Sequence, residues 1–243
     1  MSHAAQRMFV GLVSQKMSRF FNGCDVLEVG SLDINGSVRD FFKNCRYIGI
    51  DVAEGKGVDV VCQGQDYDAP DDSRDQVISC EAMEHNPYWA ATFANMLRIC
   101  KPGGLVLLTC AATGRKEHGT TRMRVLDSPL TNEMGWNYYH NLLPRDFLKI
   151  LNFEQAFYRC RFWVNWNSYD LYFCGIKAGS SETRDDEWGS MVKKVEEYVS
   201  VQNMGKVFAY RAFVARWFGD GWFRFWRDLD RRLTLKIIRK LHD

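Results

Sequence analysis

Residues 70–109, PDDSRDQVISCEAMEHNPYWAATFANMLRICKPGGLVLLT, contain the pattern that decides the fold class. Residues 76–80 and 104–110 are short, apolar runs bounded by turn residues, as buried parallel strands are. Between them, residues 87–100 place their apolar side chains along one helical stripe. This succession of strand, helix and strand predicts a doubly wound α/β sheet.

Further elements extend this sheet in both directions. Strands are predicted at 25–30, 47–51 and 58–62, and helical stretches at 3–21, 37–42 and 143–151. Residues 153–164 and 169–177 flank Asn165-Trp166-Asn167-Ser168 and predict an antiparallel hairpin at the sheet edge. Residues 178–187 are polar and predict a linker, with only helices beyond it. We therefore expect three parts, an N-terminal amphipathic helix (1–22), the α/β domain (23–178), and a linker with a C-terminal helical extension (179–243).

The composition is that of one globular domain with an appendage. The chain has 243 residues, 46% hydrophobic and 26% charged, which excludes disordered, collagenous and coiled-coil classes. No apolar run approaches the ~20 residues that a bilayer requires, and the first residues lack the apolar stretch of a signal peptide. We expect a cytoplasmic protein whose eight cysteines, which include no CxxC pair, are buried reduced thiols.

Basic charge is concentrated near the C-terminus. Residues 206–243 contain ten Lys or Arg and four Asp, whereas the whole chain has a net charge of only +2. From Trp222 onward, apolar residues recur at helical spacing with arginines beside them. This pattern is typical of a helix at an anionic membrane surface, here the inner face of the membrane. Self-association as a homodimer is the equal alternative, and docking of nucleic acid is the weaker one.

Two strand ends indicate a nucleoside ligand. Gly30 lies at the tip of the strand predicted at 25–30, where a residue without a Cβ lets the backbone approach a ligand. Asp51 closes the next strand 21 residues later, the usual place of an acid that holds both ribose hydroxyls. Each feature alone also suits an ordinary turn or a helix cap.

At this point the sequence resembles the class I S-adenosylmethionine-dependent methyltransferases over residues 24–177, in the type 11-like form of surface-glycan and secondary-metabolite pathways. Residues 70–109 carry the most specific part of the resemblance, with Glu84 and His85 as the family's Glu-His signature and residues 101–104 as its Lys-Pro-Gly-Gly turn. The resemblance implies S-adenosylmethionine as the cofactor and a Rossmann-like seven-stranded sheet that ends in a reversed hairpin. NAD-binding Rossmann domains lack that hairpin.

The cofactor residues follow from the same resemblance, with two departures. Leu32 and Ile34 occupy two of the family's loop glycine positions, so we expect Asp33, Asn35 and Gly36 to shape the turn. Gln63 stands where the family usually has an Asp for the adenine amino group, and its amide oxygen accepts the same hydrogen bond. The predicted cofactor-binding residues are Glu28, Gly30, Ser31, Asp51, Gln63, Gly64 and Cys80.

The substrate side is expected after the strand at 104–110, because open α/β sheets bind ligands beyond the carboxyl ends of their strands. Residues 110–147 form a connection too long and too rich in functional groups for a simple loop. Its acid, cations and rings suit a polar acceptor, such as a nucleotide-linked or lipid-linked sugar, although solvated surface or packing explains each residue equally well. The predicted substrate-binding residues are Arg115, Glu117, Arg122, Tyr138 and Tyr139.

Methyl transfer to a hydroxyl requires alignment of the reacting atoms and removal of a proton. A neutral imidazole is a suitable base near pH 7, so His118 is the first candidate and His140 the second. A reaction without a discrete base is the alternative. No pattern in the sequence predicts a metal site.

The sequence therefore predicts an enzyme that O-methylates a sugar or another small polar acceptor in cell-surface glycan biosynthesis. One alternative is an RNA methyltransferase that docks through its basic aromatic tail. Against it, the rest of the chain is net acidic, and CEAMEHNPYW at 80–89 is no Asn/Asp-Pro-Pro-Tyr motif. The other alternative is a non-catalytic nucleoside-binding scaffold.

Overall fold

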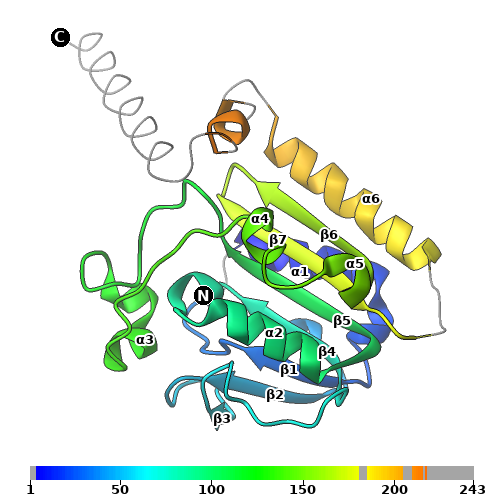
Figure 1. Cartoon of the computed structure of the whole chain (residues 1–243), viewed down its shortest axis with the longest axis horizontal. Coiled ribbons are helices and arrows are strands. Elements are labelled where there is room, and N and C mark those ends of the chain that lie inside the picture. Colours follow the sequence, from blue (N-terminus) through cyan, green and yellow to red (C-terminus); the bar gives the residue numbers. More distant parts are fainter. Residues whose placement is uncertain (1–3, 181–184, 205–209, 216, 218–243) are drawn as a thin grey trace.

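The structure is a computed structural model and describes residues 4–180, 185–204, 210–215 and 217. Within this part of the chain lies a seven-stranded sheet of order β3-β2-β1-β4-β5-β7-β6 (Figure 1). Pairing is parallel from β3 to β5, whereas β7 runs antiparallel to both of its neighbours. The strands are β1 (Asp25–Val29), β2 (Arg46–Asp51), β3 (Val60–Val61), β4 (Arg74–Cys80), β5 (Cys100–Ala111), β6 (Phe157–Asn165) and β7 (Asp170–Lys177). This architecture is the predicted one, including the reversed hairpin at the edge.

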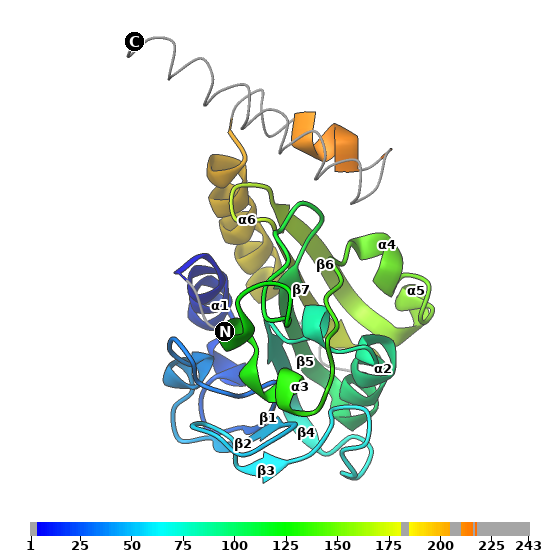
Figure 2. The same ribbon diagram turned by 90° about the vertical axis from the view of Figure 1, so that its left-hand side faces the viewer.

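Helices cover both faces of the sheet (Figure 2). One face carries α1 (Ala4–Lys16) and α6 (Asp185–Gln202), whose apolar side chains share a core with β1, β4, β5 and β7. The opposite face carries α2 (Trp89–Ile99), α4 (Pro144–Phe147) and α5 (Phe153–Ala156) over a second core. Both faces of the central strands are buried, which explains why these strands are continuous apolar runs in the sequence.

Alternation along β1 decides which side chains reach which core. Leu27 and Val29 pack in the core under α2, whereas Val26 packs in the core under α1. Because successive side chains of a strand point to opposite faces, Glu28 lies on the same face as Val26. The same rule places Cys80 of β4 in the core under α1.

Some predicted elements are wrong in type or length. Residues 153–156 are a helical turn instead of the start of a strand, because the Asn152 side chain accepts hydrogen bonds from the N–H groups of Glu154 and Gln155 and caps a helix. Residues 38–41 form a short 3₁₀ helix, η2 (Val38–Phe41), capped by Ser37. The helix predicted at 143–151 is the single turn α4, and α1 ends at Lys16 with a 3₁₀ turn after it.

The region after the sheet is described only in part. Helix α6 begins at Asp185, inside the predicted linker 178–187, and buries Met191, Val195 and Val199 in the core under α1. Residues 210–215 are helical as predicted, and most of the membrane-binding stripe expected in 204–243 lies outside the described residues. Among the described residues, no helix has the length and apolarity needed to cross a membrane. The three-part division of the chain stays a prediction.

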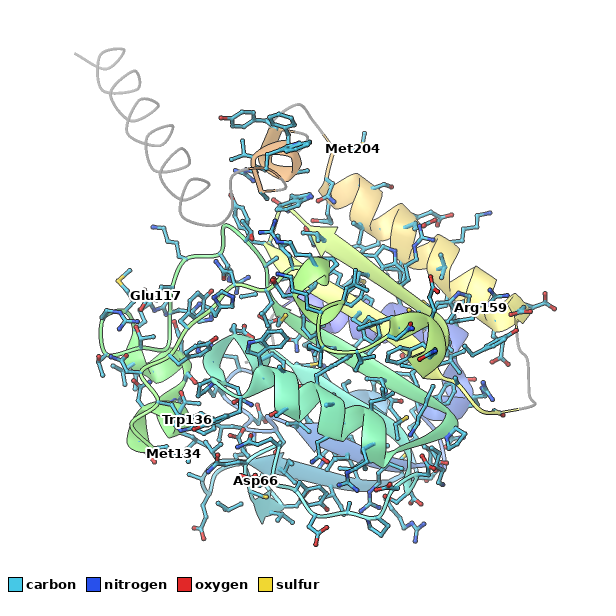
Figure 3. The ribbon with its side chains drawn as sticks, viewed as in Figure 1. Asp66, Glu117, Met134, Trp136, Arg159 and Met204 are labelled. Carbon is cyan, nitrogen blue, oxygen red and sulfur yellow. The ribbon has the colours of Figure 1, made fainter. Side chains whose placement is uncertain are left out.

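All eight cysteines lie among the described residues and form no disulfide. Five are buried as predicted, but Cys45, Cys62 and Cys160 are only half-buried. The long connection from β5 to α4 contains the 3₁₀ turn η4 (Val125–Asp127) and the helix α3 (Pro129–Glu133). Glu117 and Trp136 both lie on this connection, at the end of the molecule that carries α3 (Figure 3).

Candidate active site

Gly30 allows the loops after β1 and β4 to touch. Its φ is +83°, and a Cβ added there would lie 2.3 Å from the Cβ of Ala82. Residues with an L side chain rarely adopt this backbone conformation, and two non-bonded carbon atoms do not approach so closely. The close approach that this glycine permits is to Ala82, and the predicted approach of its backbone to a ligand stays a prediction.

Asp51 holds the neighbouring loop in place. Its Oδ2 accepts a hydrogen bond from the N–H of Leu32 at 3.0 Å, and its Oδ1 accepts one from the N–H of Val52 at 2.8 Å. Burial raises the pKa of the Asp51 carboxyl above its ordinary value. Since each carboxylate oxygen has two lone pairs, both oxygens can still accept from ligand hydroxyls.

Asp33 replaces the missing loop glycines as a turn former, as predicted. Its Oδ1 accepts from the N–H of Gly36 at 2.7 Å, and its Oδ2 pairs with Lys56 Nζ at 2.7 Å. The hydrogen bond to Lys56 lowers the pKa of the Asp33 carboxyl.

Two adjacent hollows lie beside Gly30 and Asp51 and form one cleft. The first, of about 370 Å³, is lined by Val52, Cys62, Gly64, Met83 and Trp136, among others. The second, of about 400 Å³, reaches Glu81, His85 and residues 127–131. Gly30, Asp51, Ala82 and Thr131 line both hollows. The cleft therefore follows the ends of β1, β2 and β4, under the connection that carries α3.

The predicted cofactor residues divide into two groups. Gly30, Asp51 and Gly64 line the cleft. Gly64 admits no side chain, because a Cβ there would lie 2.6 Å from Thr92 Cγ2. Glu28, Ser31, Gln63 and Cys80 are absent from the described lining of the cleft.

The four predicted cofactor residues outside the lining of the cleft make contacts within the protein. Glu28 is buried under α1, accepts a hydrogen bond from the Tyr47 hydroxyl at 2.8 Å, and has its pKa raised to about 7 by that burial. Burial raises the pKa of the Cys80 thiol to about 12. Gln63 Oε1 accepts from Gln65 Nε2 at 2.6 Å, and Ser31 is buried. Their role as cofactor contacts stays a prediction.

Several predicted substrate residues are engaged by the protein itself. Arg115 donates to the carboxylate of Asp170 at 2.8 Å and to the carbonyl of Ser168 at 2.7 Å, so it ties the connection to β7. Glu117 accepts from Arg122 Nε at 2.7 Å within the connection. His140 is exposed, and its backbone N–H donates to the carbonyl of Glu84 at 2.8 Å. The Tyr138 ring lies 6.4 Å from the His140 ring.

His85, which lines the second hollow, packs against two further rings that are not among the lining residues. The centroid of the His118 ring lies 4.9 Å from those of His85 and Tyr139, and the His85 and Tyr139 centroids are 5.4 Å apart. Nδ1 of His118 lies 2.9 Å from the carbonyl oxygen of Lys116. Because a carbonyl only accepts, Nδ1 carries the proton and Nε2 has the lone pair. Burial lowers the pKa of His118 and lowers that of His85 to about 3, so both rings are neutral near pH 7.

Glu84 lies against the same rings. It is 0% exposed, and burial raises the pKa of its carboxyl to about 8, with the charge of Glu81 acting in the same direction. Glu84, His85 and His118 each place one potential ligand atom within 4.8 Å of the others. Although the Glu-His signature was visible in the sequence, nothing there indicated that His118 folds against it. Thr131 and Trp136, which line the cleft, gave no signal at all.

Comparison with known proteins agrees with the fold. A family model described as a methyltransferase domain matches residues 27–108. No curated protein sequence matches the chain significantly.

Among solved structures, 1,6-didemethyltoxoflavin-N1-methyltransferase of Burkholderia thailandensis has 12% identity and a TM-score of 0.49, over 72% of this chain and 79% of that one. Phosphoethanolamine N-methyltransferase 2 of Haemonchus contortus, in complex with S-adenosylmethionine, has 16% identity and a TM-score of 0.49. That match covers 70% of this chain and 53% of the Haemonchus chain. The [4+2]-cyclase SpnF has 13% identity and a TM-score of 0.49. That match covers 72% of this chain and 82% of the SpnF chain.

The cleft fits S-adenosylmethionine, the cofactor that a methyltransferase domain implies. The Asp51 carboxylate suits ribose hydroxyls, and Val52 and Met83 supply apolar surface for an adenine ring. Glu81 adds negative charge in the hollow next to Gly30, which suits the cationic methionine end. The strand order and the reversed β7 are those of the class I S-adenosylmethionine-dependent methyltransferase fold, and residues 27–108 within it match the methyltransferase-domain family.

Proposed function

We propose that this protein transfers a methyl group from S-adenosylmethionine to a hydroxyl of a sugar or another small polar acceptor in cell-surface glycan biosynthesis. The observation that carries the proposal is the layout of the cleft. The carboxylate of Asp51 stands in both hollows, and the imidazole of His85 stands in the second, with His118 packed on it. Asp51 and the His85 imidazole line the same hollow and the proposed base packs on that imidazole, which supports the proposal.

The cofactor is held by residues of the sheet edge. Asp51 accepts hydrogen bonds from the ribose hydroxyls, and the bare backbone of Gly30 faces the methionine end. The bound cofactor supplies an electrophilic methyl carbon on a sulfonium. Leu32, Ile34 and Leu130 line the second hollow and reduce the access of water to it.

The acceptor hydroxyl must lose a proton as its oxygen attacks the methyl carbon in line with the breaking carbon–sulfur bond. His118 Nε2 carries a lone pair, because Nδ1 donates to Lys116, and the depressed pKa of the ring keeps that lone pair available near neutral pH. We assign the proton to this nitrogen, and the electron pair of the broken bond stays on sulfur. His140 is the second candidate for the base.

The connection that carries α3 supplies the acceptor side. The Tyr139 ring packs against both His85 and His118, so this predicted substrate residue lies beside the proposed base. Arg122 and Glu117 pair with each other at a more exposed position and suit the hydroxyls of a polar acceptor. Arg115, which is bound to the buried Asp170, is better suited to holding the connection in place.

Methyl transfer can be tested directly. The purified protein is incubated with S-adenosylmethionine carrying a labelled methyl group and with panels of nucleotide-linked sugars, lipid-linked sugars and RNA. We expect the label, and a mass gain of one methyl group, on a sugar hydroxyl. Label on RNA would support the nucleic-acid alternative. Cofactor binding without transfer to any acceptor would favour the scaffold alternative.

A further inference from the structure

We propose that Glu84, His85 and His118 form a binding site for one divalent transition-metal ion of the Zn²⁺ class. Each residue offers a ligand atom, and these atoms lie within 4.8 Å of one another. In a tetrahedral site with bonds of about 2.1 Å, ligand atoms are about 3.4 Å apart. To bind one ion, the three ligand atoms must therefore move closer to one another by on the order of 1 Å, which small side-chain rotations can supply.

The strongest evidence is the Glu84 carboxyl. It is 0% exposed, and neither of its oxygens has a hydrogen-bond partner among the described residues. Buried polar groups are almost always partnered, and an unpartnered one indicates a missing ion or water. A cation between Glu84 and the two rings would satisfy this carboxylate and offset the cost of burying its charge.

The histidines are prepared for the same role. His118 directs Nδ1–H to the carbonyl of Lys116 at 2.9 Å, the outer contact that typically orients a metal-bound imidazole and leaves Nε2 for the ion. His85 is 4% exposed, and its Nδ1 has no hydrogen-bond partner among the described residues. Both rings therefore retain a lone pair, that of His85 in an almost fully buried position and that of His118 in a half-buried one.

The surrounding charge favours a cation. Glu81 is near enough to Glu84 for their charges to interact. The nearby guanidinium of Arg115 is neutralised by Asp170 at 2.8 Å, which limits its repulsion. Two imidazoles and one carboxylate are the ligand set of catalytic Zn²⁺ sites and of Fe²⁺ sites, whereas Mg²⁺ prefers oxygen ligands alone.

The site would also change the chemistry of the cleft. This consequence, unlike metal binding itself, rests on the proposed function. Three protein ligands leave a position open, and His85 lines the hollow that Gly30 and Asp51 share. An acceptor hydroxyl bound at the open position would become more acidic, because the ion stabilises the alkoxide, and its proton would pass to water. Nε2 of His118 has a single lone pair, so with the ion bound His118 acts as its ligand and no longer as the base.

Metal binding is tested on the full-length protein after treatment with a chelator. Titration with Co²⁺ should give the visible absorption bands of a low-coordinate nitrogen and oxygen site at one ion per chain. Zn²⁺ should displace the Co²⁺, and Mg²⁺ in large excess should not. Zn²⁺ should also raise the melting temperature of the protein.

The variants Glu84→Gln and His118→Ala should each weaken Co²⁺ binding by roughly tenfold or more. For metal binding, His140→Ala is the matched control, because His140 is exposed and does not belong to the cluster of Glu84, His85 and His118. Circular dichroism verifies that each variant is folded, and the shift in melting temperature with Zn²⁺ should vanish in both site variants. The proposal is overturned if the folded wild type binds no ion, or if both site variants bind as tightly as the wild type.

The two proposals fail separately. Stoichiometric binding without methylation of any acceptor leaves the metal site standing and counts against the proposed function. Methyl transfer by a wild-type protein that binds no ion supports the proposed function and removes the metal site.

Discussion

A Cβ on Gly30 would lie 2.3 Å from the Cβ of Ala82, so the loops after β1 and β4 can meet only if residue 30 has no side chain. This contact joins the two loops at the centre of the cleft, since both residues line both hollows. It makes Gly30 a sharper test of the cleft than any of its charged residues.

Gly30→Ala is expected to lower the affinity for S-adenosylhomocysteine at least tenfold, because the two loops must separate. Calorimetric titration measures this. Gly23→Ala is the matched control, since Gly23 also has a positive φ, +69°, but a Cβ there would meet nothing within 4 Å. Both variants should lose stability from backbone strain. If Gly30→Ala binds as tightly as Gly23→Ala, the contact does not shape the cofactor site.

Asp51→Ala is expected to weaken cofactor binding by roughly 1 to 3 kcal/mol, because two ribose hydroxyls lose their acceptor. The N–H groups of Leu32 and Val52 also lose theirs, so the loop loosens. Asp51→Asn keeps one acceptor oxygen and should be intermediate. Isothermal titration with S-adenosylmethionine and its demethylated product measures the series. An intact protein that binds neither compound would disprove the cofactor assignment.

In the metal-free protein, where His118 is the proposed base, His118→Ala is expected to lower turnover on a confirmed acceptor by roughly 10² or more, with cofactor affinity little changed. The imidazole works in its neutral form, and burial lowers its pKa below 6.5. The activity of the wild type should therefore fall as the pH drops below that range, and the variant should lose this low-pH limb. Near-full turnover by the variant would make His118 structural and transfer the same test to His140.

Glu28→Gln is expected to change how stability depends on pH. The pKa of Glu28 is raised from 4.5 to about 7 by burial, so the folded state holds this proton more tightly than the unfolded chain does. Protonated Glu28 therefore makes its full contribution to the free energy of unfolding below about pH 4.5, and this contribution is lost as the pH rises through about 7. The glutamine still accepts from the Tyr47 hydroxyl but does not titrate.

Melting temperatures measured from pH 4 to 8 should therefore rise for Glu28→Gln relative to the wild type as the pH increases. Equal pH profiles for the two proteins would contradict the assignment. Cofactor titration of the same variant also tests whether Glu28, which lies on the α1 face of the sheet, contacts the cofactor as the sequence predicted.

Deletion of residues 219–243 is expected to abolish salt-sensitive binding to anionic lipid vesicles, because this segment combines arginines with tryptophan and phenylalanine. Sedimentation with anionic and with neutral vesicles measures it. If the full-length protein binds neither kind of vesicle and is dimeric, self-association explains the apolar stripe instead.

The sequence by itself determined the sheet and one end of the cleft. Parallel strands buried on both faces need continuous apolar runs, and those runs locate β1, β2, β4 and β5 without any tertiary information. The carboxyl ends of such strands meet at one edge, so Gly30 and Asp51 could be placed beside a nucleoside from their positions alone. A local signal misled at residues 153–156, where the cap from Asn152 outweighed the apolar pattern of a strand.

Only the tertiary structure decided what the polar groups face. Strand alternation places Glu28 and Cys80 on the face of the sheet that α1 covers, and neither is among the described lining of the cleft. A connection of some thirty residues has no periodicity that fixes its path, so the contact of His118 with His85 could not be read from their spacing of 33 residues. The same holds for Arg115 and the buried Asp170, since long-range ion pairs depend on where the chain returns and not on local sequence.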